Sequence, residues 1–402
     1  MTGGCLPAAA AADILVTGYD QNSWSEKTAP ATSTVEQVAV AWLKDLLRVP
    51  NEAAGTLCGG ATIGNIVSLA CARDKVLTHV GWDVDKDGLQ GAPPVHLYVG
   101  AEGHSSVFKA TRVVGLGGRD GRFTTLLPCD EDGAIQRDSV RHLEPPVPPA
   151  IVVLQAGHVN TGAFDDFVSL IAWAKSGPSG GSGIWVHVDG AFGLWAGVSA
   201  ARRGLVEGVE MADSWATDLH KILNVPYDSG LVVIRDSACL YNSMSAVAPY
   251  LEGTNKKAMT TPLPPELQNS RRARGVVAYA ALRSLGRSGV EKMVDGFCDL
   301  CAHLVDLVVT KGGQRAELLN VVCFNQALIR FADDDDLTRK IAMDVQESGL
   351  CWIAPTLYRG KVVIRLSVCC WKTDEKEIDQ AASAILACAE RALASTSSCP
   401  EH

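Results

Sequence analysis

Short apolar runs alternate with amphipathic segments between about residues 55 and 236. The amphipathic segments, such as Ile66–Ala72 and Phe167–Ala174, have apolar residues at helical spacing. Strand-length apolar runs lie between them and predict strands at Val95–Val99, Ile151–Leu154, Ile184–Val188, Ser214–Thr217 and Leu231–Ile234. Strands and helices that take turns along a chain form right-handed crossovers and a mostly parallel sheet covered on both faces. We therefore predict an α/β fold.

The pattern changes after about residue 240. Glu252–Asn269 holds Gly253 and three prolines, which predicts a long irregular loop of the kind that is usually functional or mobile. A helix is expected from Arg271 to about Leu285, ending at Gly286. The rest reads as a small α+β domain of helix, strand, helix, strand and terminal helix, with strands at Val321–Phe331 and Val362–Val368 and a frayed end at Ser395–His402. The predicted organisation is an N-terminal segment (1–54), a large domain (55–289) and a small C-terminal domain (290–402).

Composition and charge narrow the possible partners. The 402 residues include 36 Lys plus Arg and 45 Asp plus Glu, a net charge of −9, and no basic block. That balance predicts neither nucleic-acid nor anionic-lipid binding and favours a small molecule. The chain has no apolar run of the ~18 residues that a spanning helix needs, and Met1–Ala12 lacks the basic start of a signal peptide. We expect a cytoplasmic protein.

Cysteine spacing predicts no metal site. The 13 cysteines are scattered, odd in number and not arranged in paired CxxC blocks. Cys298 and Cys301 form one isolated CxxC, which is more typical of buried, inert thiols.

Four segments of the sequence carry side chains suited to chemistry, and three of them follow predicted strands. Gly59–Asn65 is a small-residue turn leading into a helix, which can bind an anion. Asp189 follows a strand at the edge where α/β sheets bind ligands, and Lys221 follows the next strand, where a desolvated amine could attack a carbonyl. His104 could stack on a flat ring or donate a hydrogen bond. Taken one at a time, each has a simpler interpretation: an ordinary turn, a helix-capping acid, a surface lysine and a structural histidine. Together they are the groups needed to hold pyridoxal phosphate.

The same residues carry a family resemblance. The matching motifs are His187–Ala191, Asp218–Lys221, His104–Ala110 and Asn160–Asp165. With them the chain resembles, over nearly its whole length, the group II pyridoxal-phosphate-dependent amino acid decarboxylases. The resemblance implies the aspartate-aminotransferase fold (fold type I), with a mostly parallel central sheet and a small C-terminal α+β domain. It makes 55–289 the cofactor-binding domain.

The resemblance also implies roles for individual residues. Lys221 would form the internal aldimine, and Asp189 would pair with the pyridinium nitrogen. His104 would stack on the ring. The other cofactor-binding positions, around the ring and phosphate, would be Ala61, Thr62, Ala191, Asp218 and His220. Asp218 is awkward there, because a carboxylate repels phosphate.

Substrate-binding positions follow in the same way. Arg365 matches an arginine that clamps a substrate carboxylate, for which bidentate geometry favours Arg over Lys. Trp24 belongs to the region that lines the side-chain pocket. Val159 stands where a hydroxyl is common, with His158 beside it. Tyr250 borders a loop, Leu251–Ser270, that contains no tyrosine.

Three departures leave alternatives open. The Val159 substitution and the loop without tyrosine, the residue that reprotonates the carbanion in many relatives, favour an oxidative alternative. It would be decarboxylation coupled to oxidative deamination, or another lyase reaction, in place of simple decarboxylation of an L-amino acid to amine and CO₂. The chain also begins late relative to the family, which suggests a non-catalytic dimer partner as a further alternative, although Asp189 and Lys221 are retained. A homodimer is expected by resemblance, and the proton donor is Lys221, His220 or Tyr250.

Overall fold

The computed structural model describes residues 4–245, 264, 265 and 267–397. They form two compact units. The larger comprises Thr2–His158 and Phe164–Lys292, and the smaller comprises Val159–Ala163 and Met293–His402, in each case as far as the residues are described.

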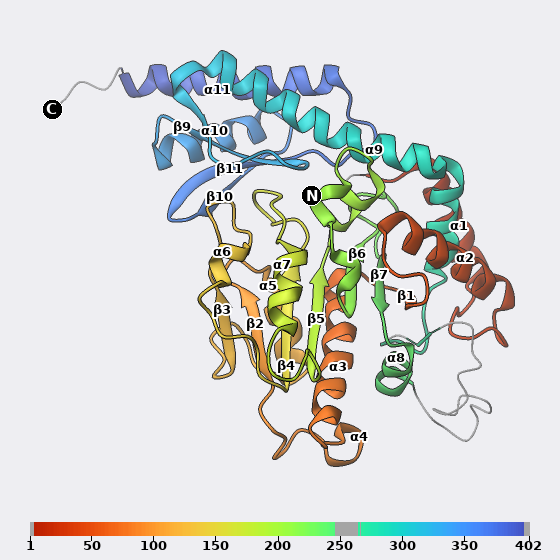
Figure 1. The fold of residues 1–402 in the computed structure, drawn as a ribbon. Coiled ribbons are helices and arrows are strands. Elements are labelled where there is room, and N and C mark those ends of the chain that lie inside the picture. The colour runs from red at the N-terminus through yellow and green to blue at the C-terminus, as the bar shows by residue number, and fades with distance from the viewer. Residues whose placement is uncertain (1–3, 246–263, 266, 398–402) are drawn as a thin grey trace. The chain divides into compact units, whose positions relative to one another are not determined.

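A seven-stranded sheet forms the centre of the larger unit (Figure 1), in the order β1-β7-β6-β5-β4-β2-β3. Its strands are β1 (Ala54–Cys58), β2 (His96–Gly100), β3 (Thr124–Leu127), β4 (Ala150–Gln155), β5 (Ile184–Asp189), β6 (Ser214–Asp218) and β7 (Gly230–Ile234). The pairs from β3 to β6 are parallel, and β7 runs antiparallel to both β6 and β1. This confirms the predicted fold class. It also places the carboxyl ends of β1, β2, β4, β5 and β6 at one edge.

Helices and 3₁₀ turns surround this sheet. They are α1 (Pro7–Tyr19), α2 (Pro30–Leu47), α3 (Ala61–His79), α4 (Val84–Asp87), α5 (Ser105–Val113), α6 (Arg137–Val140), α7 (Phe167–Lys175), η1 (Gly193–Val198), η2 (Arg203–Val206), η3 (Val209–Met211) and α8 (Ser237–Met244). The most deeply packed is α3, which lies against β5, β6 and β7. It comes close because Gly64 has no side chain: a Cβ there would lie 2.9 Å from the Cβ of Ala216.

The smaller unit has its own antiparallel sheet, in the order β10-β11-β9-β8. Its elements are the C-terminal part of α9 (Arg274–Gly312), η4 (Gly313–Arg315), β8 (Ala316–Leu318), β9 (Gln326–Phe331), α10 (Asp335–Glu347), β10 (Ala354–Tyr358), β11 (Lys361–Ser367) and α11 (Glu375–Ser397). The Asp334 side chain caps α10 by accepting a hydrogen bond from Leu337 N at 2.9 Å. The α+β character predicted for this part of the chain is confirmed.

Several predicted boundaries were wrong. The strand expected at Val321–Phe331 begins only at Gln326, because the Asn320 side chain accepts from Leu328 N and holds the chain in a turn. The helix expected from Arg271 begins at Arg274, and a second helix follows directly after Gly286 (φ 62°). Residues 395–397, expected to fray, belong to α11. Most of the predicted loop Glu252–Asn269 lies outside the described residues.

Strands β1, β3, β8 and β10 were not predicted. β1 is short and made largely of small residues, and its Gly55 is required because a Cβ would lie 2.8 Å from Val40 Cγ1. β10 contains Pro355, which a sheet tolerates at an edge, and β10 is an edge strand.

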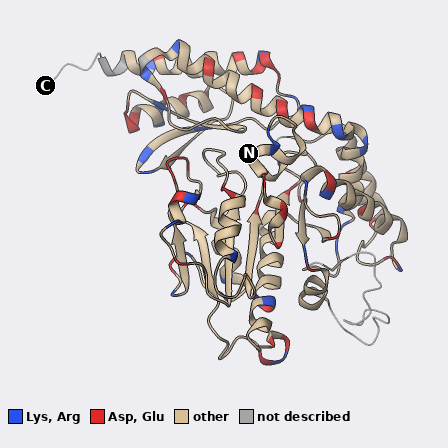
Figure 2. Cartoon of the chain, in the orientation of Figure 1, with Lys and Arg blue, Asp and Glu red and all other residues tan. Residues whose placement is uncertain are grey.

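Charged residues are almost absent from the large sheet (Figure 2). Its seven strands contain only two, Asp189 and Asp218, and each is the last residue of its strand. Among the described residues no helix is long and apolar enough to cross a membrane.

A buried ion pair joins α2 to the chain just before α9. Arg271 Nη1 lies 2.8 Å from Glu36 Oε1, and both side chains are almost fully buried. Burial raises the pKa of Glu36, and the Arg271 guanidinium opposes that rise. Removing one partner of such a pair leaves an uncompensated charge in a dry site.

We expect Arg271→Met to lower the free energy of unfolding by about 3–5 kcal/mol near pH 8. The loss should shrink as the pH falls towards 5. Without Arg271 the pKa of Glu36 in the folded protein lies further above its unfolded value, so the folded state takes up a proton and becomes more stable at low pH. Urea unfolding at both pH values measures this. Arg287→Ala, which removes an exposed ion pair with Asp45, is the control and should cost under about 1 kcal/mol. Equal losses for the two variants would contradict the assignment.

Candidate active site

The carboxyl edge of the large sheet gathers the residues predicted to carry chemistry. Asp189 ends β5, Asp218 ends β6, and His104 lies between β2 and α5. Lys221 lies in the connection from β6 to β7. Because Asp218 pairs with Gly230 at the start of β7, that connection stays at the same edge. The structure therefore brings together four residues, from the ends of three strands, that the sequence separates.

Asp189 is a carboxylate in a dry environment, 3% exposed. Its Oδ1 accepts from Ala191 N at 3.2 Å, and its Oδ2 accepts from Asn65 Nδ2 at 3.2 Å. Burial raises the pKa of Asp189, while the charges of His104 and Lys221 act in the opposite direction. Among the described residues it makes no salt bridge. A buried acid with neutral donors alone is suited to an incoming cation.

The turn before α3 forms an anion-binding cradle. Gly60 has a φ of 131°, and a Cβ there would lie 3.0 Å from both Asp218 Oδ1 and His220 Cε1. The first amide of the helix, Ala61 N, donates to Asp218 Oδ1 at 2.6 Å. Thr62 is the second residue of the helix. The Asp218 carboxylate thus takes the place that the helix terminus offers to an anion.

Lys221 is held by the same carboxylate. Its Nζ lies 2.8 Å from Asp218 Oδ2, and the side chain is 26% exposed, so the amine is reachable. His220 Nε2 lies 3.4 Å from Asp218 Oδ1. Burial lowers the pKa of His220, and the Asp218 charge partly opposes this.

Tyr227 covers His220. The two rings are stacked, with centroids 4.2 Å apart and planes 29° apart, while Tyr227 remains 61% exposed. Sequence analysis did not single out this tyrosine, because its partner is seven positions earlier and only the β6–β7 connection brings them together.

His104 caps α5. Its Nδ1 accepts from Ser106 N at 3.2 Å and lies 2.7 Å from Ser106 Oγ. Since Nδ1 accepts a hydrogen bond from a backbone amide, the neutral ring carries its proton on Nε2. The cap fixes the imidazole at the same sheet edge as Asp189.

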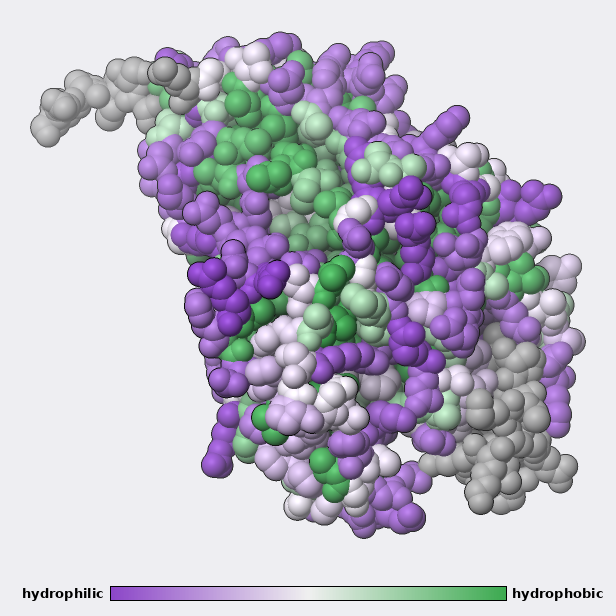
Figure 3. All heavy atoms as spheres, in the orientation of Figure 1, coloured by the Kyte–Doolittle hydropathy of each residue, from purple (hydrophilic) through white to green (hydrophobic). Residues whose placement is uncertain are grey.

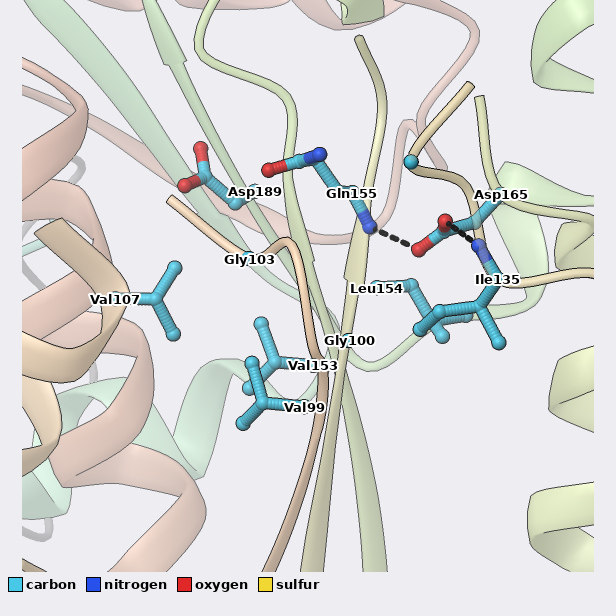
Figure 4. A pocket seen from close by; sticks show the side chains of 11 residues that line it. Val99, Gly100, Gly103, Val107, Ile135, Val153, Leu154, Gln155, Asp165 and Asp189 are labelled. Atoms are coloured by element: carbon cyan, nitrogen blue, oxygen red, sulfur yellow. Dashed lines mark hydrogen bonds between the residues drawn. The ribbon is translucent and has the colours of Figure 1, made fainter. Parts of the chain in front are cut away.

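A small pocket lies beside Asp189 (Figure 4). It is lined mostly by apolar side chains and glycines from β2, β4, α5 and the turns that follow the strands. The Gln155 side chain extends towards Asp189 at one end. Asp165 lies at the other end and accepts from Ile135 N and Gln155 N, each at 2.7 Å. Burial raises the pKa of Asp165 to about 7. These bonds fix the loop that closes the pocket.

The remaining predicted positions are less directly placed. Arg365 lies on β11 of the smaller unit, where burial lowers the pKa of its guanidinium. Val159 also belongs to the smaller unit, and Trp24 is half-buried between α1 and α2. His158 is buried, with its ring against Gly133. Tyr250 lies outside the described residues. The substrate roles of these residues stay predictions.

Sequence analysis missed the polar residues behind Asp189. Asn65, His187 and Ser214 are all fully buried and hydrogen-bonded to one another. Alternation could have indicated them, because Trp185, His187 and Asp189 share one face of β5. The contribution of Asn65 needs the packing of α3 and could not be read from spacing.

These residues fit the cofactor that the sequence suggested. Pyridoxal phosphate presents a phosphate, an aldehyde and a ring nitrogen that can carry a proton. The helix terminus suits the first, Lys221 the second and the uncompensated carboxylate of Asp189 the third. No group of three or more His, Cys, Asp or Glu side chains in the described chain is arranged to hold a metal ion.

Comparison with known proteins agrees with this cofactor. Residues 1–327 match the family model described as the pyridoxal-dependent decarboxylase conserved domain. Tryptophan decarboxylase 2 of Oryza sativa subsp. japonica is 25% identical over 94% of this chain and 76% of its own. Phenylacetaldehyde synthase of Arabidopsis thaliana is 25% identical over 92% of this chain and 76% of its own. The crystal structure of Oryza sativa TDC with PLP and tryptamine superposes with a TM-score of 0.85, at 22% identity, over 97% of this chain and 82% of that one.

We expect Asp218→Asn to bind pyridoxal phosphate about tenfold more tightly than the unchanged protein. The substitution removes a negative charge from the anion-binding helix terminus and frees the amine of Lys221. Titration followed by protein fluorescence measures the dissociation constant. Asp236→Asn is the matched control, because Asp236 is also paired with a lysine, Lys75, at 2.7 Å but caps α8 instead. Weaker binding by Asp218→Asn would show that the carboxylate assists the phosphate.

Proposed function

We propose that this chain, which belongs to the pyridoxal-dependent decarboxylase family, decarboxylates an L-amino acid to the amine and CO₂ with Lys221 as the residue that binds the cofactor covalently. The observation that carries the proposal is the pairing of two groups at one sheet edge. One is a reachable amine, Lys221, and the other is a buried carboxylate, Asp189, that makes no salt bridge among the described residues.

Pyridoxal phosphate supplies an electron sink for the pair of electrons left on Cα when the carboxylate leaves. Asp189 keeps the ring nitrogen protonated by offering it a fixed negative charge. Ala61 and Thr62, in the first turn of α3, would hold the phosphate with their backbone N–H groups once it displaced the Asp218 carboxylate, which now accepts from Ala61 N, and His220 borders the same place. Ala191 acts through Asp189, because its N–H holds the Oδ1 atom.

Lys221 must change its protonation state to work. As an ammonium it is paired with Asp218, and only the neutral amine is a nucleophile. Displacement of Asp218 releases Lys221 Nζ from its ion pair. Lys221 Nζ, or His220 beside it, can afterwards return a proton to Cα.

The substrate side of the proposal draws on the remaining predicted residues. By the family resemblance, His104 would flank the ring, Arg365 would bind the substrate carboxylate, and Trp24 and Val159 would belong to the side-chain pocket. The two compared relatives are named for tryptophan decarboxylation and phenylacetaldehyde synthesis, and an aromatic-L-amino-acid decarboxylase of Bacillus atrophaeus is 25% identical. Aromatic L-amino acids are therefore the first substrates to test.

We also propose a cytoplasmic homodimer. The 13 cysteines are scattered along the sequence and odd in number, which suits a reducing compartment better than a disulfide framework. Large apolar side chains are exposed on α1, where Ile14 is 72% and Tyr19 is 75% exposed, as an interface would require. Figure 3 also shows hydrophobic residues gathered on the surface of the smaller unit. Trp352 and Leu357 of that unit are 77% and 67% exposed.

Lys221→Ala should abolish turnover and the visible absorbance of the bound cofactor while the circular dichroism spectrum stays unchanged. The reason is that the Lys221 side chain is partly exposed and serves chemistry, not packing. Lys109→Ala, which removes an exposed lysine of α5, is the control and should keep both. Turnover by Lys221→Ala at the unchanged rate would refute the assignment. Turnover by the purified chain would also dispose of the non-catalytic alternative.

A second candidate outcome is the oxidative one, release of an aldehyde instead of an amine. It is favoured by the absence of tyrosine from Leu251–Ser270 in the sequence and by the similarity to phenylacetaldehyde synthase. A carbanion that is protonated slowly is open to attack by dioxygen. The two outcomes share every residue described above up to the loss of CO₂.

Product balance separates them. We expect amine and CO₂ in equal amounts from L-tryptophan, L-tyrosine or L-phenylalanine, both under air and under nitrogen, because Lys221 and His220 stand ready as proton donors. Chromatography, with an oxygen electrode, makes the measurement. Oxygen consumption with aldehyde, ammonia and peroxide, all absent under nitrogen, would establish the oxidative outcome instead.

A further inference from the structure

A row of buried polar groups runs behind Asp189, on the face of β5 covered by α3. Trp185 Nε1 donates to Ser214 Oγ at 2.8 Å, and Ser214 Oγ lies 2.9 Å from His187 Nδ1. His187 Nε2 lies 3.0 Å from Asn65 Oδ1, and Asn65 Nδ2 donates to Asp189 Oδ2 at 3.2 Å. His187, Asn65 and Ser214 are fully buried. None of these groups is needed for packing alone, since apolar residues would fill the same space.

The chemistry of the two ends fixes the direction of every bond. The indole of Trp185 can only donate, so Ser214 Oγ accepts from it and its own proton is free for His187 Nδ1. An ionised carboxylate can only accept, so Asn65 presents its NH₂ to Asp189 and its oxygen to His187. His187 must then carry its proton on Nε2. Burial lowers the pKa of His187 to about 3, so the ring is neutral and has one proton to place.

Regular secondary structure holds every side chain of this hydrogen-bonded row in place. Trp185, His187 and Asp189 alternate onto one face of β5, and Ser214 is the residue of β6 directly paired with His187. Asn65 reaches Asp189 because Gly64, its neighbour on α3, lets the helix approach β6. All four links therefore belong to elements that are rigid and buried.

We propose that Trp185, Ser214, His187 and Asn65 form a one-way hydrogen-bond relay that positions Asp189 and keeps it ionised for the ring nitrogen of the cofactor. Each donor in the relay polarises the next towards the carboxylate. The relay opposes the effect of burial, which favours the neutral acid. These are positioning residues, because only Asp189 would touch the cofactor. The proposal rests on the proposed function.

Ser214→Ala is the decisive variant, because Ser214 touches neither Asp189 nor the site. Without the Ser214 hydroxyl, His187 Nδ1 loses its donor, and only Asn65 Oδ1 still favours the proton on Nε2. The other tautomer turns a lone pair towards Asn65 Oδ1 and breaks the row. We expect about tenfold weaker binding of pyridoxal phosphate. We also expect the ring nitrogen of ¹⁵N-labelled cofactor to lose its proton at a lower pH, seen by its NMR chemical shift. Ser214→Thr keeps the hydroxyl and should restore both values.

Ser68→Ala is the matched control. Ser68 is a fully buried serine one turn after Asn65 on α3, and its hydroxyl has no hydrogen-bond partner in the described structure. It should leave affinity and ring protonation unchanged. If Ser214→Ala matches the unchanged protein, or if Ser68→Ala causes the same loss, the relay is refuted. A cofactor that fails to bind the unchanged protein would instead overturn the proposed function. Asn65→Leu should reproduce the Ser214→Ala shift, and Ser214→Ala carries the test alone if that variant does not fold.

Discussion

A carboxylate at the end of a fully buried strand is the constraint on which the site depends. Ionised Asp189 is costly in a dry environment unless donors meet it. The chain provides one from the turn after β5, Ala191 N, and one from α3, Asn65. The second requires the helix to lie unusually close to the sheet, which the missing side chain of Gly64 permits. The close packing of α3 on the sheet thus serves the hydrogen bond to Asp189 as much as the burial of the apolar residues of α3.

Asp218, the other charged residue of the sheet, has the opposite surroundings. It faces the positive end of α3 and the ammonium of Lys221, so its charge is balanced within the chain. Asp189 has neutral donors instead. The two carboxylates end neighbouring strands, yet one is already satisfied and the other is left to attract a cation. Because of this difference, the site favours an anionic group at the start of α3 and a cationic group at the end of β5.

Sequence analysis predicted the residues of the site better than the strands and buried polar residues that hold them in place. His104, Asp189, Asp218 and Lys221 follow strands that alternation revealed, and the rule that strand ends share an edge brought them together. β1 and β3 were missed because small residues and short length leave no period to detect. Asn65, Ser214 and Tyr227 were missed for a different reason. Their roles arise from contacts between elements, and a polar residue in an apolar run gives no sign of its partner.

The ends of β5 and β6 differ in how firmly their functional residues are held and in how far solvent reaches them. On the β5 side every polar group is buried and its hydrogen bonds have one possible direction, so Asp189 cannot turn away from its position. On the β6 side Lys221 is partly exposed and is held by an ion pair that another anion can replace. A residue that forms and breaks covalent bonds needs that freedom, whereas a residue that stabilises charge on a ring must not move. β5 ends inside the core, whereas β6 ends in the partly exposed connection to β7. These two neighbouring parallel strands therefore meet both requirements with little difference in their backbones.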